Sequence, residues 1–248
     1  MKLLALCCEV FHREICALSA QSTHTIDLQF LPKGLHDLGS EKMRARLQEV
    51  IDGVDVRRYE AIVMGYGLCS NGVRGLRSRS LPLILPRAHD CITLFLGSRG
   101  RYREYFDSHP GVYFETSGWL ERGKVDADLQ GETIQAQMGM DQGYQELVEK
   151  HGEENARFIW ETLHAHETRY GQITFIEMGI APDDFFEQQA REKAAKRGWN
   201  FEKMQGDIRL IERLLNGPWD SEDFLYVPPG HEIILTHDDQ IVTTKMIP

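Results

Sequence analysis

Three cysteines and one histidine are the residues of this 248-residue chain whose types and spacing most clearly suggest chemistry. Cys8, Cys69 and Cys91 each stand just past the end of an apolar run that predicts a strand. Ligand sites of an open parallel sheet gather outside the carboxyl ends of its strands, so these thiols are expected to meet in space. His89 lies two residues before Cys91, and in an extended loop both side chains point the same way. The pattern predicts a metal site of three thiols with an imidazole nearby.

The donor atoms narrow the choice of metal, because thiolates favour zinc or an iron–sulfur cluster over magnesium or calcium. Three thiolates and the imidazole of His89 would complete a tetrahedral zinc site of the structural type. Three thiolates alone would leave one position open for substrate or water, as catalysis requires. The sequence leaves both arrangements open. For the remaining cysteines, Cys7 and Cys16, burial as small apolar side chains is the simpler expectation.

Three charged residues are candidates for catalytic roles around such a site. Glu9 is adjacent to Cys8, and Glu177 follows the apolar run Ile173–Ile176, so both stand at predicted strand ends. A carboxylate in that position can move protons as a general acid or base. Arg87, shortly before Cys91, is predicted to bind an anionic group of the substrate.

The loop around Cys69 offers an alternative function, because it contains glycines at positions 65, 67 and 72. Glycine allows tight turns and close approach of the backbone to a ligand. A glycine-rich loop that leads into a helix can bind phosphate through its N–H groups, which makes Gly67, Asn71 and Gly72 candidates for nucleotide or phosphate binding. The loop matches neither GxGxxG nor the lysine-bearing phosphate loop.

Alternating strands and helices are predicted to position these residues. Short apolar runs at Leu3–Cys7, Ala61–Met64 and Leu83–Leu85 are typical of strands covered on both faces. Between the first two, apolar residues at helical spacing predict helices over Phe11–Ala20 and Glu41–Ile51. Strands that alternate with helices imply right-handed crossovers and a mostly parallel sheet.

A second alternating unit follows in the other half of the chain. Strands are predicted at Val112–Glu115, Ile173–Met178 and Asn200–Met204, with helices over Pro182–Arg197 and Asp207–Leu215. The remaining predicted elements are a charged helical stretch over Gln142–Arg169, a strand at Phe224–Val227, and a hairpin of Glu232–Leu235 with Gln240–Thr244.

These elements predict an α/β fold with a mostly parallel sheet flanked by helices, two βα units around one cleft and a C-terminal hairpin. Residues 1–130 are expected to form the N-terminal βα unit with the cysteine and histidine site. Residues 131–248 are expected to hold the helical segment, the second βα unit and the hairpin. The whole chain can also form one compact domain, given its length.

The composition excludes several classes of protein. The formal net charge of −10 argues against a nonspecific nucleic-acid binder and against docking on an anionic membrane. No apolar stretch approaches the roughly 20 residues that span a bilayer. Five cysteines without a CxxC pair do not make the framework of a secreted disulfide protein. We therefore expect a cytoplasmic protein with reduced thiols.

Several segments together resemble one known family. They are residues 8–10 (CEV), 66–72 (YGLCSNG), 86–98 (PRAHDCITLFLGS), 101–106 (RYREYF), 110–111 (PG), 118–123 (GWLERG) and 227–231 (VPPGH). They are similar to the domain-of-unknown-function family DUF1638. The family occurs in anaerobic bacteria and methanogenic archaea, often beside corrinoid-dependent methyltransferases, which implies a role near methyl transfer or corrinoid handling and assigns no catalytic residue.

Together these features predict a metal-binding enzyme that acts on a small molecule, linked by the resemblance to corrinoid-dependent methyl transfer or one-carbon metabolism. The alternative is a non-catalytic accessory protein with a closed, structural site of three cysteines and a histidine, which docks on a methyltransferase or corrinoid protein. An enzyme needs a concave pocket that reaches the metal, and an accessory protein does not. We favour the enzyme, since a chain of this length folds without a metal staple.

Overall fold

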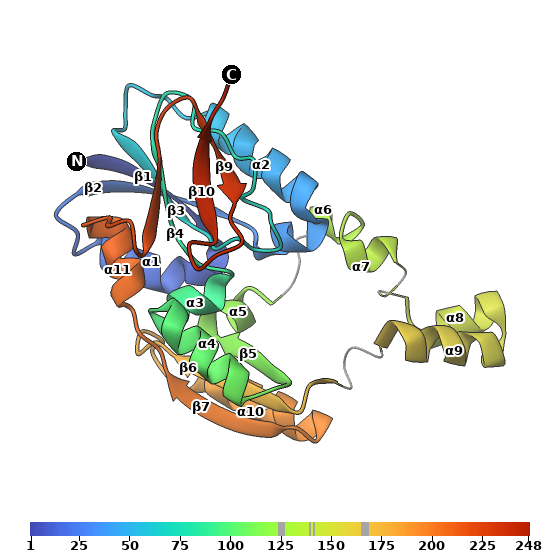
Figure 1. Cartoon of the computed structure of the whole chain (residues 1–248). Coiled ribbons are helices and arrows are strands. Elements are labelled where there is room, and N and C mark those ends of the chain that lie inside the picture. Colours follow the sequence, from blue (N-terminus) through green and yellow to red (C-terminus); the bar gives the residue numbers. More distant parts are fainter. Residues whose placement is uncertain (124–126, 139, 141, 165–168) are drawn as a thin grey trace.

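The computed structural model describes residues 1–123, 127–138, 140, 142–164 and 169–248 (Figure 1). It confirms the α/β fold, with a mostly parallel five-stranded sheet, sheet A, in the order β2-β1-β3-β4-β8. Its strands are β1 (Lys2–Cys8), β2 (Thr25–Leu31), β3 (Ala61–Gly65), β4 (Leu83–Pro86) and β8 (Phe224–Val227). The first four are parallel, and β8 pairs with β4 in the antiparallel sense.

Sheet A is covered on both faces, as its apolar strands predict. Along β1, Leu4 and Leu6 belong to one hydrophobic cluster, and Leu3 and Ala5 belong to another on the opposite face. Helix α2 (Ser40–Asp52) packs in the first cluster. The second cluster contains residues of three helices: α1 (His12–Ser19), α3 (Cys91–Leu96) and α11 (Arg209–Asn216).

The connection between β3 and β4 differs from the expected alternation, because residues 66–82 contain no helix. The C-terminal hairpin of β9 (His231–Leu235) and β10 (Val242–Met246) packs on this connection instead. Gly75 and Ser78 donate backbone hydrogen bonds of 2.7 and 2.9 Å to carbonyls of β9. The predicted hairpin is therefore confirmed, and it helps to cover a face that a crossover helix covers elsewhere.

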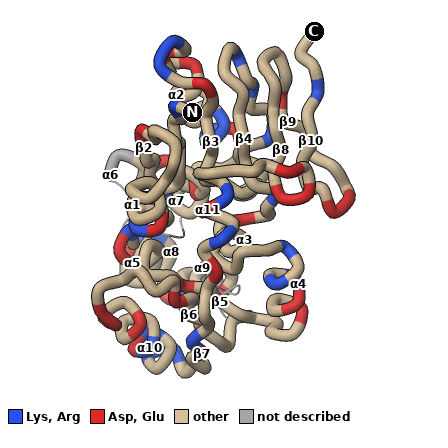
Figure 2. The backbone as a smooth tube through the Cα atoms, turned by 90° about the vertical axis from the view of Figure 1, so that its left-hand side faces the viewer, with Lys and Arg blue, Asp and Glu red and all other residues tan. Residues whose placement is uncertain are grey.

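A second parallel sheet, sheet C, has the order β5-β6-β7 and lies beside the carboxyl edge of sheet A (Figures 1 and 2). Its strands are β5 (Val112–Thr116), β6 (Gln172–Glu177) and β7 (Asn200–Gln205). The helices around it are α4 (Arg99–Ser108), α5 (Ser117–Glu121) and α10 (Phe185–Arg197). Because β5 precedes residue 130 and β8 follows it, a boundary at residue 130 does not separate the two sheets.

The described residues between α5 and β6 form four short helices, of which α8 and α9 lie apart from both sheets in Figure 1. They are α6 (Ala127–Gln130), α7 (Ile134–Gln137), α8 (Tyr144–His151) and α9 (Glu153–His164). Gly152, with a φ of 77°, separates α8 from α9 within the predicted helical stretch, and residues 165–168 of that stretch lie outside the described residues. No helix of the described chain is long and apolar enough to cross a bilayer.

Candidate functional site

The order of strands in sheet A creates a crevice at one point of its carboxyl edge. From β1, the chain runs first to β2 on one side and later to β3 on the other side. Ligands of open α/β sheets bind at such a switch point, outside the strand ends. Cys8 is the last residue of β1, and the loop that contains Cys69 follows β3 directly.

A cavity of about 410 Å³ lies at this switch point, between the carboxyl edge of sheet A and the elements of sheet C. Cys8, Cys69 and Cys91 all line it, and the exposed His89 lines it as well. The structure thus brings the four predicted metal ligands to one cavity, which we call the cleft. Aromatic side chains of β5, α4 and α5 form much of the opposite wall.

The loops after β3 and β4 run side by side and fix the position of Cys69. Leu68 and Cys69 donate backbone hydrogen bonds of 2.7 and 3.0 Å to the carbonyls of Ala88 and His89. This approach depends on Gly67, because a Cβ there would lie 2.8 Å from the backbone of Asp90. The side chain of Asp90 accepts from the N–H groups of residues 92 and 93 and so caps α3.

The backbone of the Cys69 loop is strained. Cys69, Ser70 and Asn71 have φ values of 45°, 55° and 67°, so three successive residues other than glycine are left-handed. This conformation costs roughly 1–2 kcal/mol for each of Cys69 and Ser70, and less for Asn71, whose side chain tolerates it. Strain of this kind clusters at functional sites, where surrounding contacts hold it in place.

Burial keeps the cleft thiols protonated at neutral pH in the metal-free protein. It raises the pKa of Cys8 and of Cys69 to about 12, and that of Cys91 well above its ordinary value. A bound metal cation reverses this preference, since a coordinating thiol is deprotonated.

The donors therefore fit zinc or an iron–sulfur cluster in type. As the side chains stand, however, no group of three or more histidine, cysteine, aspartate or glutamate residues in the described part of the chain could hold a metal ion. A coordination shell would require the thiols of Cys8, Cys69 and Cys91 to move closer together.

Two further residues of the cleft were missed by the sequence analysis. Lys33, just after β2, is only 8 % exposed, and Tyr66, directly after β3, is only 2 % exposed. The hydroxyl of Tyr66 has no hydrogen-bond partner among the described residues. Both positions lie at the carboxyl ends of strands of sheet A, so the rule that found the cysteines finds them when it is applied to every strand.

The three predicted catalytic residues lie outside the cavity wall. Glu9 is close to it, and its Oε1 accepts a hydrogen bond of 2.9 Å from the backbone N–H of Lys33. Glu177 stands at the end of β6, where it accepts from the N–H of Gly179 at 2.8 Å. The proton-transfer role of both carboxylates stays a prediction.

Arg87 is buried and directed away from the cleft. Its Nε donates to the carbonyl of Ser221 at 2.9 Å, and its Nη1 donates to the carbonyls of Gln240 and Val242. The guanidinium therefore joins β4 to the C-terminal hairpin and to the segment before β8. The geometry gives no support to its predicted contact with a substrate anion.

The geometry also bears on phosphate binding through the glycine loop. The N–H groups of Leu68, Cys69 and Gly72 are all engaged with carbonyls of the chain, and no helix follows the loop directly. Gly67 lines the cleft, whereas Asn71 and Gly72 do not. The loop therefore does not lead into the helix N-terminus that the prediction assumed, and phosphate binding at Gly67, Asn71 and Gly72 stays a prediction.

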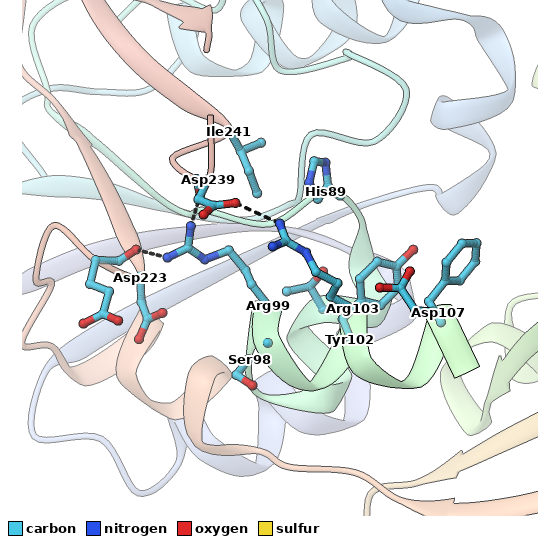
Figure 3. A pocket seen from close by; sticks show the side chains of 13 residues that line it. His89, Ser98, Arg99, Tyr102, Arg103, Asp107, Asp223, Asp239 and Ile241 are labelled. Atoms are coloured by element: carbon cyan, nitrogen blue, oxygen red, sulfur yellow. Dashed lines mark hydrogen bonds and ion pairs between the residues drawn. The ribbon is translucent and has the colours of Figure 1, made fainter. Parts of the chain in front are cut away.

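A second cavity of about 500 Å³ adjoins the cleft (Figure 3). Three side chains line both cavities: His89, Tyr102 and Phe106. In the second cavity, Arg99 donates to the carbonyl of Glu222 at 2.8 Å and Arg103 donates to Asp239 at 2.9 Å. Both arginines already donate to acceptors of the chain, so they are not free to bind a ligand. We therefore do not regard this cavity as a second site.

Comparisons with known proteins identify one family. Neither a curated protein nor a solved structure matches the chain. A family model described as "Protein of unknown function (DUF1638)" matches residues 30–215, a segment that contains Lys33, Cys69, His89 and Cys91. Since that segment spans most of the 248 residues, the resemblance seen in the sequence motifs is confirmed, and the chain belongs to the DUF1638 family.

Proposed function

We propose that the protein is a metal-dependent enzyme that acts on a small molecule in the cleft, with Cys8, Cys69 and Cys91 as the metal ligands. One observation carries the proposal: three thiols from three adjacent strand ends line a single cavity at the topological switch point. The cleft favours an enzyme over an accessory protein, because a closed structural site needs no cavity at its ligands.

The residues that line the cleft suggest separate roles in binding a substrate. The unpartnered hydroxyl of Tyr66 is available to donate a hydrogen bond to a bound molecule. The aromatic wall offers an apolar surface to the rest of that molecule. When bound, zinc would supply a Lewis acid and an iron–sulfur cluster would supply electron transfer. His89 can serve as a fourth ligand or leave that position open.

The reaction class is the part of the proposal that depends on family resemblance alone. Participation in corrinoid-dependent methyl transfer, with a corrinoid protein or methyltransferase as partner, follows from the surroundings of the family's genes and from no residue of the cleft. It stays a prediction beside the metal proposal.

Metal analysis of protein purified without oxygen tests the proposal. We expect about one zinc ion per chain, or iron together with acid-labile sulfide. Cys69→Ser should lose most of this metal, whereas Cys16→Ser, which changes a cysteine of α1 outside the cleft, should retain it. A wild-type protein that stays metal-free after reconstitution with zinc and with iron and sulfide would contradict the proposal. So would equal metal contents in the two variants.

Thermal unfolding of the same variants separates a catalytic site from a structural one. Structural zinc contributes folding free energy outright, so its loss unfolds the protein. We expect Cys69→Ser to remain folded without its metal, because the buried apolar core of sheet A does not depend on the site. A variant that unfolds on losing the metal would instead favour the accessory protein with a structural site.

A further inference from the structure

The ammonium of Lys33 is a buried positive charge without a described counterion. Lys33 is 8 % exposed and lines the cleft. Its Nζ donates to the carbonyl of Trp119 at 3.3 Å and lies 4.3 Å from the centre of the Trp119 ring. Within the described chain, the ammonium of Lys33 makes no ion pair, and this carbonyl is its one hydrogen-bond acceptor. An ammonium has three donors, so two remain for another acceptor.

Two carboxylates, those of Asp37 and Glu9, attract the charge of Lys33, but both are engaged with other groups. Glu9 accepts from the backbone N–H of Lys33 and faces Arg122 at 4.0 Å. Asp37 lies 3.1 Å from the Nε2 atom of His36. Burial of the ammonium lowers the pKa of Lys33, as expected where desolvation outweighs the attraction of these acids. A buried charge of this kind is costly unless a partner neutralises it.

Tyr66 also lines the cleft, and its buried hydroxyl has no hydrogen-bond partner among the described residues. Its hydroxyl and the ammonium of Lys33 stand at the carboxyl ends of β3 and β2, on either side of β1. Both groups can donate hydrogen bonds, and both residues are nine-tenths buried or more. Two unsatisfied donors on the wall of one cavity indicate an acceptor that belongs to a ligand.

We propose that the ligand of the cleft is a small organic carboxylate, whose anionic group pairs with Lys33 and accepts a hydrogen bond from Tyr66. Its apolar part lies against the aromatic wall formed by Tyr113, Phe114 and Trp119. A carboxylate suits the site better than a phosphate, because no arginine of the described chain lines the cleft. This inference shares the cleft with the proposed function and names the chemical class of its substrate.

Binding of a matched acid and amide tests the inference. Phenylacetate and phenylacetamide have nearly the same shape and differ in charge, so calorimetry of each isolates the contribution of the ammonium. We expect wild-type protein to bind phenylacetate at least about tenfold more tightly, since hydrogen bonds to charged groups contribute enough for that ratio. Lys33→Met should bind both probes with equal affinity, and Lys33→Arg should keep part of the preference for the acid.

Lys42→Met is the matched control, because Lys42 is a half-exposed lysine that pairs with Glu132 outside the cleft. It should keep the full preference for phenylacetate. Lys33→Met should also melt about 2–4 °C above the wild-type protein in the absence of ligand, because the change removes an unpaired buried charge. That shift shows that the variant is folded.

Three outcomes would overturn the inference: equal affinity of the wild-type protein for the two probes, an undiminished preference in Lys33→Met, or no binding of either probe. The metal proposal fails separately. A protein that holds no metal but still prefers phenylacetate leaves the carboxylate inference standing. A metal-loaded protein without that preference overturns the carboxylate inference alone.

Discussion

The carboxyl edges of the two parallel sheets are built from the same kinds of element, yet they differ in the order in which the chain visits their strands. In sheet A, the chain leaves β1 toward β2 on one side and then crosses from β2 to β3 on the other side. In sheet C, the strands follow in sequence order, β5-β6-β7, so successive connections move in one direction. A switch point therefore exists in sheet A and is missing from sheet C.

The polar groups at the two edges also differ, in whether they have hydrogen-bond partners. At the edge of sheet C, Thr116 accepts from the N–H of Trp119 at 3.1 Å and caps α5. Gln205 donates to the carbonyl of Glu177 at 2.9 Å, and Glu177 itself accepts from a loop N–H. At the edge of sheet A, Tyr66 has no partner and Lys33 has one.

The comparison shows that a position at the end of a parallel strand is not sufficient for function. Glu177 and Cys8 both occupy such positions, but the neighbours of Glu177 satisfy its carboxylate, whereas Cys8 faces a cavity. The useful signal is a strand end at a switch point together with unsatisfied polar groups.

The largest expected effect concerns a contact beside the cleft, between helix α5 next to sheet C and the turn that follows β1 of sheet A. Gly118 of α5 packs on the 3-10 turn Glu9–Phe11, and a Cβ at this position would lie 1.9 Å from the carbonyl oxygen of Val10. Because backbone atoms cannot yield as a flexible side chain does, Gly118→Ala should lower the free energy of unfolding by about 3 kcal/mol. Urea unfolding measures the loss.

Gly171→Ala is the control for this change, because Gly171 borders sheet C and a Cβ there meets nothing within 4 Å. Its free energy of unfolding should stay within about 0.5 kcal/mol of the wild-type value. Equal losses in the two variants would mean that the contact between Gly118 and Val10 does not hold the units together.

The next effect concerns Glu14, a buried carboxylate of helix α1, which packs on sheet A. Its Oε2 has no hydrogen-bond partner, and burial raises its pKa from 4.5 to about 7. The folded state thus holds the proton more tightly than the unfolded state, so the free energy of unfolding falls as the pH rises from about 4.5 to about 7. Glu14→Gln should remove this fall and exceed the wild-type protein by about 3 kcal/mol at pH 8.

Unfolding titrations between pH 4 and pH 8 test the prediction for Glu14. The exposed Glu104 of α4 supplies the control, since Glu104→Gln should leave the pH profile unchanged. Glu115 of sheet C sharpens the comparison, because this buried carboxylate is paired with Lys193. Glu115→Gln should destabilise the protein by about 2 kcal/mol, the opposite sign from Glu14→Gln. The same sign in both variants would contradict the argument.

The fold could be predicted in large part because its signals are local. The apolar run Ala61–Met64 and the strand Val112–Glu115 each match an observed strand to within one residue. The helix-free connection 66–82 was the exception. Its conformation depends on left-handed residues and on hydrogen bonds to β9, more than 150 residues later in the chain, which no local pattern contains.

The site could be predicted only where strand ends decide it. Cys8, Cys69 and Cys91 line one cavity because they lie at or after the carboxyl ends of three adjacent strands, β1, β3 and β4. Arg87 follows a strand as well, but its guanidinium donates hydrogen bonds to the carbonyls of Gln240 and Val242 and not to the cleft. Those partners come from the end of the chain, so the sequence around Arg87 gives no sign of them.

The smallest expected effect concerns the strained loop at the edge of sheet A. Ser70 is exposed, lines the cleft and has a φ of 55°, a conformation that costs glycine almost nothing. Ser70→Gly should therefore relieve roughly 1–2 kcal/mol of strain, of which the greater freedom of the unfolded chain cancels about half. We expect a net gain of about 1 kcal/mol in the free energy of unfolding. The same freedom should loosen the neighbouring thiol of Cys69 and weaken metal binding.

Chemical unfolding and metal competition with a chelator measure the two effects of Ser70→Gly on one preparation. Ser108→Gly is a suitable control, because Ser108 ends α4 away from the cleft and has no left-handed strain to relieve. It should gain no stability and leave metal binding unchanged. A loss of stability in Ser70→Gly would show that the loop is not strained. A gain in stability with unaltered metal binding would show that the strain does not position Cys69, and that the difference between the two sheet edges lies in their cavities alone.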